Sequence, residues 1–330
     1  MNIRSLVLVL LLGTASAAGW AQAPKPAPEQ GTAYTEHGFS VGEGDAALPG
    51  TLLMPDGEGS FPAMVLVHGS GPGDRDSTLG PNRPFRDIAH GLAAHGIAVL
   101  RYDKRTRVHP VAAAFDPDFN LDRESTDDAV AAVAALQRTP GVDPQRVFVF
   151  GHSLGAMLAP RIVQRSGAAG GVMFAASSRT MLDLISEQME RMARLQGANP
   201  QASAASLAAI NDLIARVRAG EDAPDAQSTL GAKAAYLRDA DALDPVAEAR
   251  ATRQPLLILH GGADIQVTDT DWDDWTAAFG EDERVTLKRY PRLGHLGIET
   301  DPDAPLASYA EAGTVDAGLI SDIAAWVNGQ

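Results

Sequence analysis

Short, continuously apolar segments alternate with segments whose apolar residues recur every three or four positions along much of this chain. The continuous runs are typical of strands buried on both faces, and they fall at 63–67, 97–102, 147–150, 171–175 and 255–260. The periodic segments at 85–95 and 122–139 are typical of helices with one apolar face. Because strands and helices alternate from residue 63 to residue 176, the pattern predicts a mostly parallel, doubly wound α/β sheet.

This alternation begins after two expected antiparallel strands, and it is interrupted once. The opening strands are predicted at 34–41 and 48–54. Residues 180–250 contain no strand pattern and predict helices at about 181–196, 202–219 and 230–242. The alternation then resumes with a helix at 269–279, a strand at 285–290 and a final helix at 313–327. We therefore expect a core of residues 34–179 and 251–330, with residues 180–250 inserted as a helical cap.

The segment around Ser153 has the pattern of a nucleophile turn. Four apolar residues lead into Gly151-His152-Ser153-Leu154-Gly155, and a segment with helical spacing follows. A strand–turn–helix of this kind lifts the serine hydroxyl clear of the sheet and requires small residues two positions to either side. The pattern predicts that Ser153 is a nucleophile, and the alternative is a Gly-rich turn with a buried serine.

A serine hydroxyl attacks at neutral pH only with a base beside it, and the base needs an acid to orient it. His295 is the candidate base, because it follows the last predicted strand in a loop between Gly294 and Gly297. Asp264 is the candidate acid, in a Gly-Gly-Ala-Asp turn just after the strand at 255–260. The alternative for Asp264 is a turn aspartate that bonds its own backbone.

Other acids and histidines fit these roles less well. Asp269 and Asp271 are fallback acids, but they look more like the N-cap and first turn of the next helix. His152 lies inside the serine turn, where we expect the backbone to aim its ring away. His68 and His260 end strands beside glycines, and we expect them to brace loops.

Two backbone N–H groups must face the oxygen that becomes negative during acyl transfer. The N–H of Leu154, directly after the serine, is one candidate. The other is expected from the Gly-rich loop at 68–76, first from Ser70 and otherwise from Gly71. Charged residues around this loop are expected to brace it through ion pairs: Asp74, Arg75, Asp76, Arg101, Asp103 and Arg105.

Composition narrows the classes of protein. The 330 residues carry a net charge of −15 without a basic block, so nucleic acid is not an expected partner. The chain has no cysteine, which excludes thiolate catalysis and cysteine-based zinc sites. No His-Glu-x-x-His, Ser-x-x-Lys or strand-linked Gly-x-Gly-x-x-Gly motif occurs. We therefore expect neither a metal nor a cofactor.

Residues 1–23 have the pattern of a secretory signal peptide, with Arg4 before a short apolar run and small residues after it. Residues 24–33 are Pro-rich and read as a flexible linker. The apolar run is too short for a transmembrane helix, and no lipid-accepting cysteine follows it. The expected location is therefore periplasmic or secreted, without a stable membrane anchor.

Five motifs together resemble a known family. They are His68–Asp76, Arg101–Arg105, Gly151–Gly155, Gly261–Asp264 and Gly294–His295. The chain resembles α/β-hydrolase serine hydrolases, and within them bacterial esterases and serine-aminopeptidase-like enzymes. The resemblance implies an α/β-hydrolase fold and cofactor-free hydrolysis of small carboxylic esters through an acyl-enzyme. The order Ser153, Asp264, His295 is the one found in that fold.

Three other functions remain open at this point. A serine peptidase acting on short peptides would use the same triad, although few acids in the cap, such as Glu187, Glu190 and Asp212, could hold a substrate amine. An acyl thioesterase is chemically similar, but export makes its substrate scarce. A non-catalytic binding protein on a hydrolase scaffold is the third. A serine rather than an aspartate at position 153 argues against the dehalogenase and epoxide-hydrolase branch.

Overall fold

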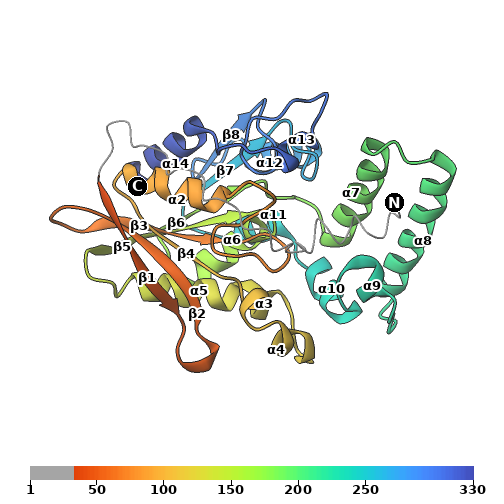
Figure 1. Ribbon diagram of the computed structural model, residues 1–330, viewed down its shortest axis with the longest axis horizontal. Helices are drawn as coiled ribbons and strands as arrows, with labels where there is room; N and C mark the ends of the chain where they lie inside the picture. Colours follow the sequence, from red (N-terminus) through yellow and green to blue (C-terminus); the bar gives the residue numbers. More distant parts are fainter. Residues whose placement is uncertain (1–32) are drawn as a thin grey trace.

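The computed structural model describes residues 33–330, which contain one eight-stranded sheet (Figure 1). Its strands are β1 (Tyr34–Val41), β2 (Leu48–Pro55), β3 (Phe61–Val67), β4 (Ala98–Tyr102), β5 (Val142–His152), β6 (Gly170–Phe174), β7 (Leu256–Gly261) and β8 (Val285–Tyr290). They are ordered β1-β2-β4-β3-β5-β6-β7-β8. β2 pairs antiparallel with β1 and β4, and all other pairs are parallel. The predicted doubly wound α/β sheet with two antiparallel opening strands is confirmed.

Helices cover both faces of the sheet. On one face lie α2 (Pro84–Ala94) and α14 (Ala317–Gly329), and on the other lie α5 (Asp127–Leu136), α6 (Leu154–Ser166) and α11 (Pro245–Ala251). Side chains of β3 alternate between these layers: Met64 and Leu66 pack in one core cluster, and Val65 and Val67 in the other. Both faces of the strand are therefore buried, which explains its continuously apolar sequence.

The chain between β6 and β7 is helical. It forms α7 (Met181–Leu195), α8 (Pro200–Arg218), α9 (Ala226–Leu230) and α10 (Ala234–Asp241), and then α11. Figure 1 shows α7 to α10, here called the cap helices, to one side of the sheet. The helix expected at 230–242 is confirmed as α10, but it begins at Ala234, because Gly231 adopts φ = 85° and ends the separate short helix α9.

The predicted helix at 122–139 is also irregular at its start. Residues 122–126 form a π-helical turn, η2 (Asp122–Thr126), and regular α-helix begins only with α5. The final helix begins at Ala317 rather than at 313, because the Asp316 side chain accepts the Leu319 N–H at 2.9 Å and caps it. Short helices complete the chain: η1 (Gly44–Ala46), α3 (Arg105–Val108), α4 (Pro110–Phe115), α12 (Asp269–Phe279) and α13 (Ala307–Ala310).

The predicted signal peptide lies outside the described residues, as does the predicted linker up to residue 32. Within residues 33–330, the helices are all too short or too polar to cross a membrane.

Candidate active site

Ser153 lies at the turn between β5 and α6 with a strained backbone. Its φ and ψ are 55° and −119°, a conformation rare for any residue with a side chain. A Cβ atom on Gly151 would lie 2.2 Å from the Gly155 carbonyl oxygen, and one on Gly155 would lie 2.4 Å from the Val67 carbonyl oxygen. The turn therefore excludes side chains at both glycines, as the sequence predicts.

Asp264 and His295 are brought together across 31 residues of chain. The Nδ1 atom of His295 lies 2.7 Å from Oδ2 of Asp264, and both residues are buried. The other carboxylate oxygen, Oδ1, accepts the backbone N–H groups of Gln266 at 2.7 Å and Val267 at 3.1 Å. Asp264 is thus both a turn aspartate and the partner of the histidine, with one oxygen for each contact.

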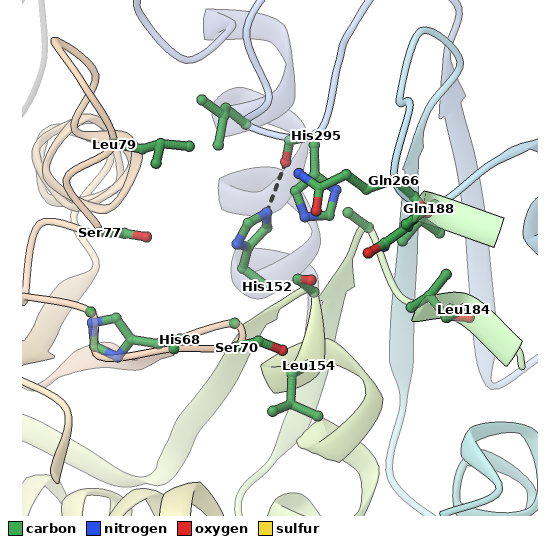
Figure 2. Close-up of a pocket in the computed structure, with 18 of the residues that line it drawn as sticks. His68, Ser70, Ser77, Leu79, His152, Leu154, Leu184, Gln188, Gln266 and His295 are labelled. Carbon is green, nitrogen blue, oxygen red and sulfur yellow. Dashed lines mark hydrogen bonds between the residues drawn. The ribbon is translucent and has the colours of Figure 1, made fainter. Parts of the chain in front are cut away.

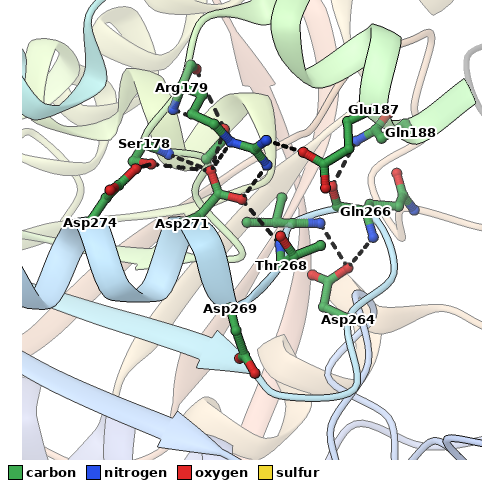
Figure 3. A network of polar contacts seen from close by, with 12 residues as sticks. Ser178, Arg179, Glu187, Gln188, Asp264, Gln266, Thr268, Asp269, Asp271 and Asp274 are labelled. Carbon is green, nitrogen blue, oxygen red and sulfur yellow. Dashed lines mark hydrogen bonds and ion pairs between the residues drawn. The ribbon is translucent and has the colours of Figure 1, made fainter. Parts of the chain in front are cut away.

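The two fallback acids are engaged elsewhere (Figure 3). Asp269 lies on the surface, where it pairs with Arg289 at 2.9 Å. Asp271 is fully buried and pairs with Arg179 at 2.8 Å. It also completes the capping box of α12, in which Thr268 is the N-cap. The carboxylate that forms the hydrogen bond to His295 is that of Asp264, not that of Asp269 or Asp271.

The expectation that His152 points away from the site is wrong. Its ring lies against that of His295, with the centroids 4.7 Å apart, and its Nε2 lies 2.8 Å from the His295 carbonyl oxygen (Figure 2). A carbonyl only accepts, so Nε2 carries the proton. Burial, followed by the nearby His295, lowers the pKa of His152 to about 3. His152 is therefore a neutral donor that holds the backbone of the His295 loop.

The Gly-rich loop after β3 runs beside the serine. A Cβ atom on Gly69 would lie 3.1 Å from the Cβ of Ser153. Ser70, Gly71 and Leu154 line the same pocket as Ser153, so the candidate oxyanion donors are gathered around it. These positions permit the predicted pair of N–H donors.

Ion pairs brace this loop as expected, except that Asp74 accepts backbone N–H groups and forms no salt bridge within the described residues. Arg75 pairs with Asp103 at 2.8 Å, and Arg101 pairs with Asp76. Inside the loop, the Nε2 atom of His68 lies 2.8 Å from the Asp74 carbonyl oxygen. Burial and then the charge of Lys104 lower the pKa of His68 to about 4. Arg105 instead pairs with Asp128 of α5, so its contact fixes the following helix rather than the loop.

A pocket of about 210 Å³ joins these groups. Its lining comes from the serine turn, the Gly-rich loop, the loop that carries His295 and the cap helix α7, whose Leu184 and Gln188 appear in Figure 2. The α7 wall is mostly apolar: Met181, Leu184, Ile185, Met189 and Met192. Long, flexible thioether side chains adapt to apolar groups of varied shape.

The cap and the acid turn are also linked by polar contacts (Figure 3). Gln188 of α7 donates its side-chain amide to the Gln266 carbonyl oxygen at 3.2 Å. Arg179, before α7, joins Asp271 of α12 to Glu187 of α7. Sequence reasoning missed these contacts, because a glutamine on a helix face carries no signal of its distant partner.

Within residues 33–330, no group of three or more His, Cys, Asp or Glu is arranged to hold a metal ion.

The strand order, the strained serine turn and the buried Asp–His pair are together the architecture of an α/β hydrolase. Residues 64–308 match the sequence model of the alpha/beta hydrolase family, and the chain belongs to that family. Esterase EstD of Thermotoga maritima is 39% identical over 281 residues, which cover 85% of this chain and 65% of that protein. The chain therefore spans just under two thirds of this relative's length.

Solved structures share the fold at low sequence identity. An esterase of Pyrococcus furiosus superimposes with a TM-score of 0.53 at 15% identity, over 90% of this chain and 91% of that one. Dipeptidyl peptidase 4 of Porphyromonas gingivalis gives 0.51 at 14% identity, over 90% of this chain and 36% of that one. An esterase and a peptidase are both similar in fold, so the fold alone does not select between these reactions.

Proposed function

We propose that this protein is a serine esterase that cleaves small carboxylic esters through an acyl-enzyme. The observation that carries the proposal is the buried Asp264–His295 pair in the pocket that contains the strained Ser153. The similarity to a protein named an esterase over 85% of the chain supports the same reaction.

The proposed first step forms the acyl-enzyme. Because Nδ1 of His295 faces Asp264, its Nε2 is the nitrogen that takes the proton from the Ser153 hydroxyl. The serine oxygen bonds to the ester carbonyl carbon, and the carbonyl oxygen becomes negative. When this intermediate collapses, the bond to the alkoxy oxygen breaks and the alcohol leaves with the proton from His295.

The second step releases the acid. A water oxygen attacks the acyl carbon while His295 takes one water proton, and the bond to Ser153 breaks as the proton returns to the serine oxygen. In both steps the N–H groups of Leu154 and Ser70, with Gly71 as the fallback for Ser70, are proposed to face the negative oxygen. The start of α6 directly behind Ser153 adds the partial positive charge of a helix N-terminus.

The charges around the pocket favour esters over peptides with a free amine. Among the described residues that line it, Asp74 alone has a carboxylate, and its Oδ1 accepts the N–H groups of Asp76 and Thr78. Glu187 of the cap is paired with Arg179 and Arg191. A short-peptide aminopeptidase needs carboxylates to hold the substrate ammonium, and Asp74, whose Oδ1 is used within its own loop, is the single carboxylate that the described lining offers.

The test is a substrate panel with the purified protein: p-nitrophenyl esters, aminoacyl anilides and acyl-CoA thioesters. We expect ester turnover that is lost in Ser153→Ala, and labelling of the wild type by a fluorophosphonate that is lost in the same variant. Faster anilide or thioester turnover would replace the esterase assignment with peptidase or thioesterase. A folded wild type that neither turns over any of these substrates nor becomes labelled would favour a non-catalytic binding protein.

We also infer that the protein is exported to the periplasm or beyond. The support is the pattern of residues 1–23, with Arg4, the apolar run of residues 6–12 and Ala-x-Ala ends at 15–17 and 21–23. Cell fractionation followed by N-terminal sequencing tests this inference. A shortened protein outside the cytoplasm is expected, and a full-length cytoplasmic protein would contradict it.

A further inference from the structure

Lys104 contacts the loop beside Ser153 at two points. Its backbone N–H donates to the Gly73 carbonyl oxygen at 3.0 Å. Its Nζ donates to the Gly69 carbonyl oxygen at 2.8 Å. Only 3% of the lysine side chain is exposed, and Lys104 is not among the residues that line the pocket. The ammonium is therefore buried against the loop and lies outside the pocket lining.

The position of this ammonium fixes the direction of one peptide group. The Gly69 carbonyl and the Ser70 N–H belong to the same peptide unit, and within residues 33–330 there is no cis peptide bond. In a trans peptide the C=O and N–H point in opposite directions. Because the Lys104 ammonium contacts the Gly69 carbonyl oxygen, the Ser70 N–H points away from that ammonium, and Ser70 itself lines the pocket that contains Ser153.

A buried ammonium needs a charged partner, and Lys104 has one. The Glu124 carboxylate accepts from its Nζ at 2.5 Å, and only 6% of that side chain is exposed. Glu124 lies in the π-helical turn η2, an irregularity that is often found at functional sites. The second oxygen of Glu124 accepts the hydroxyl of Tyr236, which lies on cap helix α10 and stacks on Phe119.

We propose that Lys104 is a positioning residue that orients and polarises the Gly69–Ser70 peptide as an oxyanion donor, and that Tyr236 of the cap holds it in place through Glu124. This inference rests on the proposed esterase function. A positive charge at the carbonyl oxygen draws electron density from the peptide, so its N–H becomes a stronger donor to the negative oxygen of the intermediate. The donor is in place before the substrate arrives, which is the condition for effective electrostatic catalysis.

The first test replaces the ammonium by an apolar chain of similar length, Lys104→Met. Because removal of one whole oxyanion donor lowers kcat by about 100- to 1,000-fold, misorientation of one donor is expected to lower kcat by about 10- to 100-fold, with KM nearly unchanged. Lys288→Met is the matched control, since Lys288 lies on the surface of β8 and pairs with Asp322. The folded fraction of each variant is measured from its thermal melt, and kcat is calculated per folded molecule.

Inhibitor binding separates positioning from general loss of structure. A trifluoromethyl ketone forms a serine adduct with a negative oxygen, whereas the matching methyl ketone binds mainly as a ground-state analogue. Lys104→Met should weaken binding of the trifluoromethyl ketone by about the factor by which it lowers kcat, and it should leave binding of the methyl ketone unchanged. Equal weakening of both ketones would mean a structural role and would overturn the proposal.

The absence of native cysteine allows a rescue experiment. In Lys104→Cys, the introduced thiol is alkylated with 2-bromoethylamine in mild denaturant, which restores an ammonium at nearly the original distance. Recovery of most of the lost kcat supports the proposal, with iodoacetamide as the neutral control. Recovery of kcat with both reagents, or with neither, would contradict it.

Tyr236→Phe tests the cap end of the chain and keeps the buried ion pair, so its effect on kcat in the wild-type background can be measured even if the lysine variants do not fold. We expect kcat to fall about two- to fivefold in the wild-type background and not at all in Lys104→Met, because coupled residues are non-additive. If Tyr236→Phe lowers kcat by the same factor in the wild type and in Lys104→Met, the cap does not act through Lys104. If the wild type itself hydrolyses no ester, the proposed function has failed; if it does and Lys104→Met keeps full kcat, only this inference has failed.

Discussion

Nδ1 of His295 lies 2.7 Å from Oδ2 of Asp264, while Oδ1 of the same carboxylate is held by two backbone N–H groups. One oxygen thus fixes the turn and the other faces the imidazole. The turn holds the carboxylate in place whether or not the histidine is charged, so a substitution can alter one contact and keep the other.

Asp264→Asn is therefore the informative substitution. Its amide oxygen can still accept the turn N–H groups, but its NH₂ group would face Nδ1 and favour the wrong tautomer of His295. We expect kcat to fall by about 10³- to 10⁴-fold with the fold retained, as measured by ester turnover and circular dichroism. Asp269→Asn is the control and should keep its activity. A reversed result would move the acid role to Asp269.

Gly155→Ala should destabilise the fold strongly. The added Cβ would lie 2.4 Å from the Val67 carbonyl oxygen, which belongs to the central strand β3 and cannot move away. We expect a loss of about 2–4 kcal/mol in the free energy of unfolding, or no folded protein. Gly38→Ala is the control, because a Cβ there meets no atom within 4 Å. Equal urea midpoints for the two variants would show that the turn tolerates a side chain.

Two buried histidines should make the fold sensitive to acid. The pKa values of His68 and His152 are lowered from 6.5 to about 4 and about 3, so the folded protein keeps both neutral where the unfolded chain binds protons. Stability from these groups is present above about pH 6.5 and decreases as the pH falls toward these lowered values, with uptake of about two protons on unfolding. Urea unfolding measured across this range checks the slope.

His152→Gln keeps a side-chain N–H donor for the His295 carbonyl but cannot titrate. It should reduce the number of protons taken up on unfolding by about one, so the free energy of unfolding should depend less steeply on pH. The exposed His37 provides the control, since His37→Gln should leave the slope as it is in the wild type. An unchanged slope in His152→Gln would mean that other groups cause the acid loss.

The α7 wall should determine which acyl groups the pocket accepts. Leu184 is buried and lines the pocket, whereas Leu195 on the same helix is 39% exposed and does not. Leu184→Trp fills part of the apolar space, so turnover of octanoate esters should fall about tenfold or more relative to acetate esters. Leu195→Trp should leave this ratio unchanged. Parallel losses on both esters would show that the acyl chain lies elsewhere.

The elements that could be predicted from the sequence are those whose residue pattern lies within a single short segment. The apolar runs predicted β3 to β7 because each is buried on both faces, and the glycines around Ser153 predicted a turn in which a Cβ does not fit. Asp264 and His295 could be selected because each follows a strand, and parallel strands place their carboxyl ends at one edge of the sheet.

Contacts between distant segments could not be predicted in this way. Tyr236 and Glu124 are 112 residues apart, and they meet only because the cap docks against η2. The direction of the His152 ring is determined by the loop that carries His295, 143 residues later. The break at Gly231 could have been predicted, because glycine often ends a helix. The prediction relied on the spacing of apolar residues alone and therefore included Gly231 in the helix.

The backbone at Ser153 has a cost in stability, which the proposed nucleophilic role of this residue explains. A residue with a side chain at φ = 55° and ψ = −119° lowers the stability margin of the whole domain by about 1–3 kcal/mol. Glycine adopts such angles freely, so Ser153→Gly should give a protein that melts at a higher temperature and cannot attack an ester. The residue proposed as the nucleophile is then also one that selection for thermal stability alone would replace.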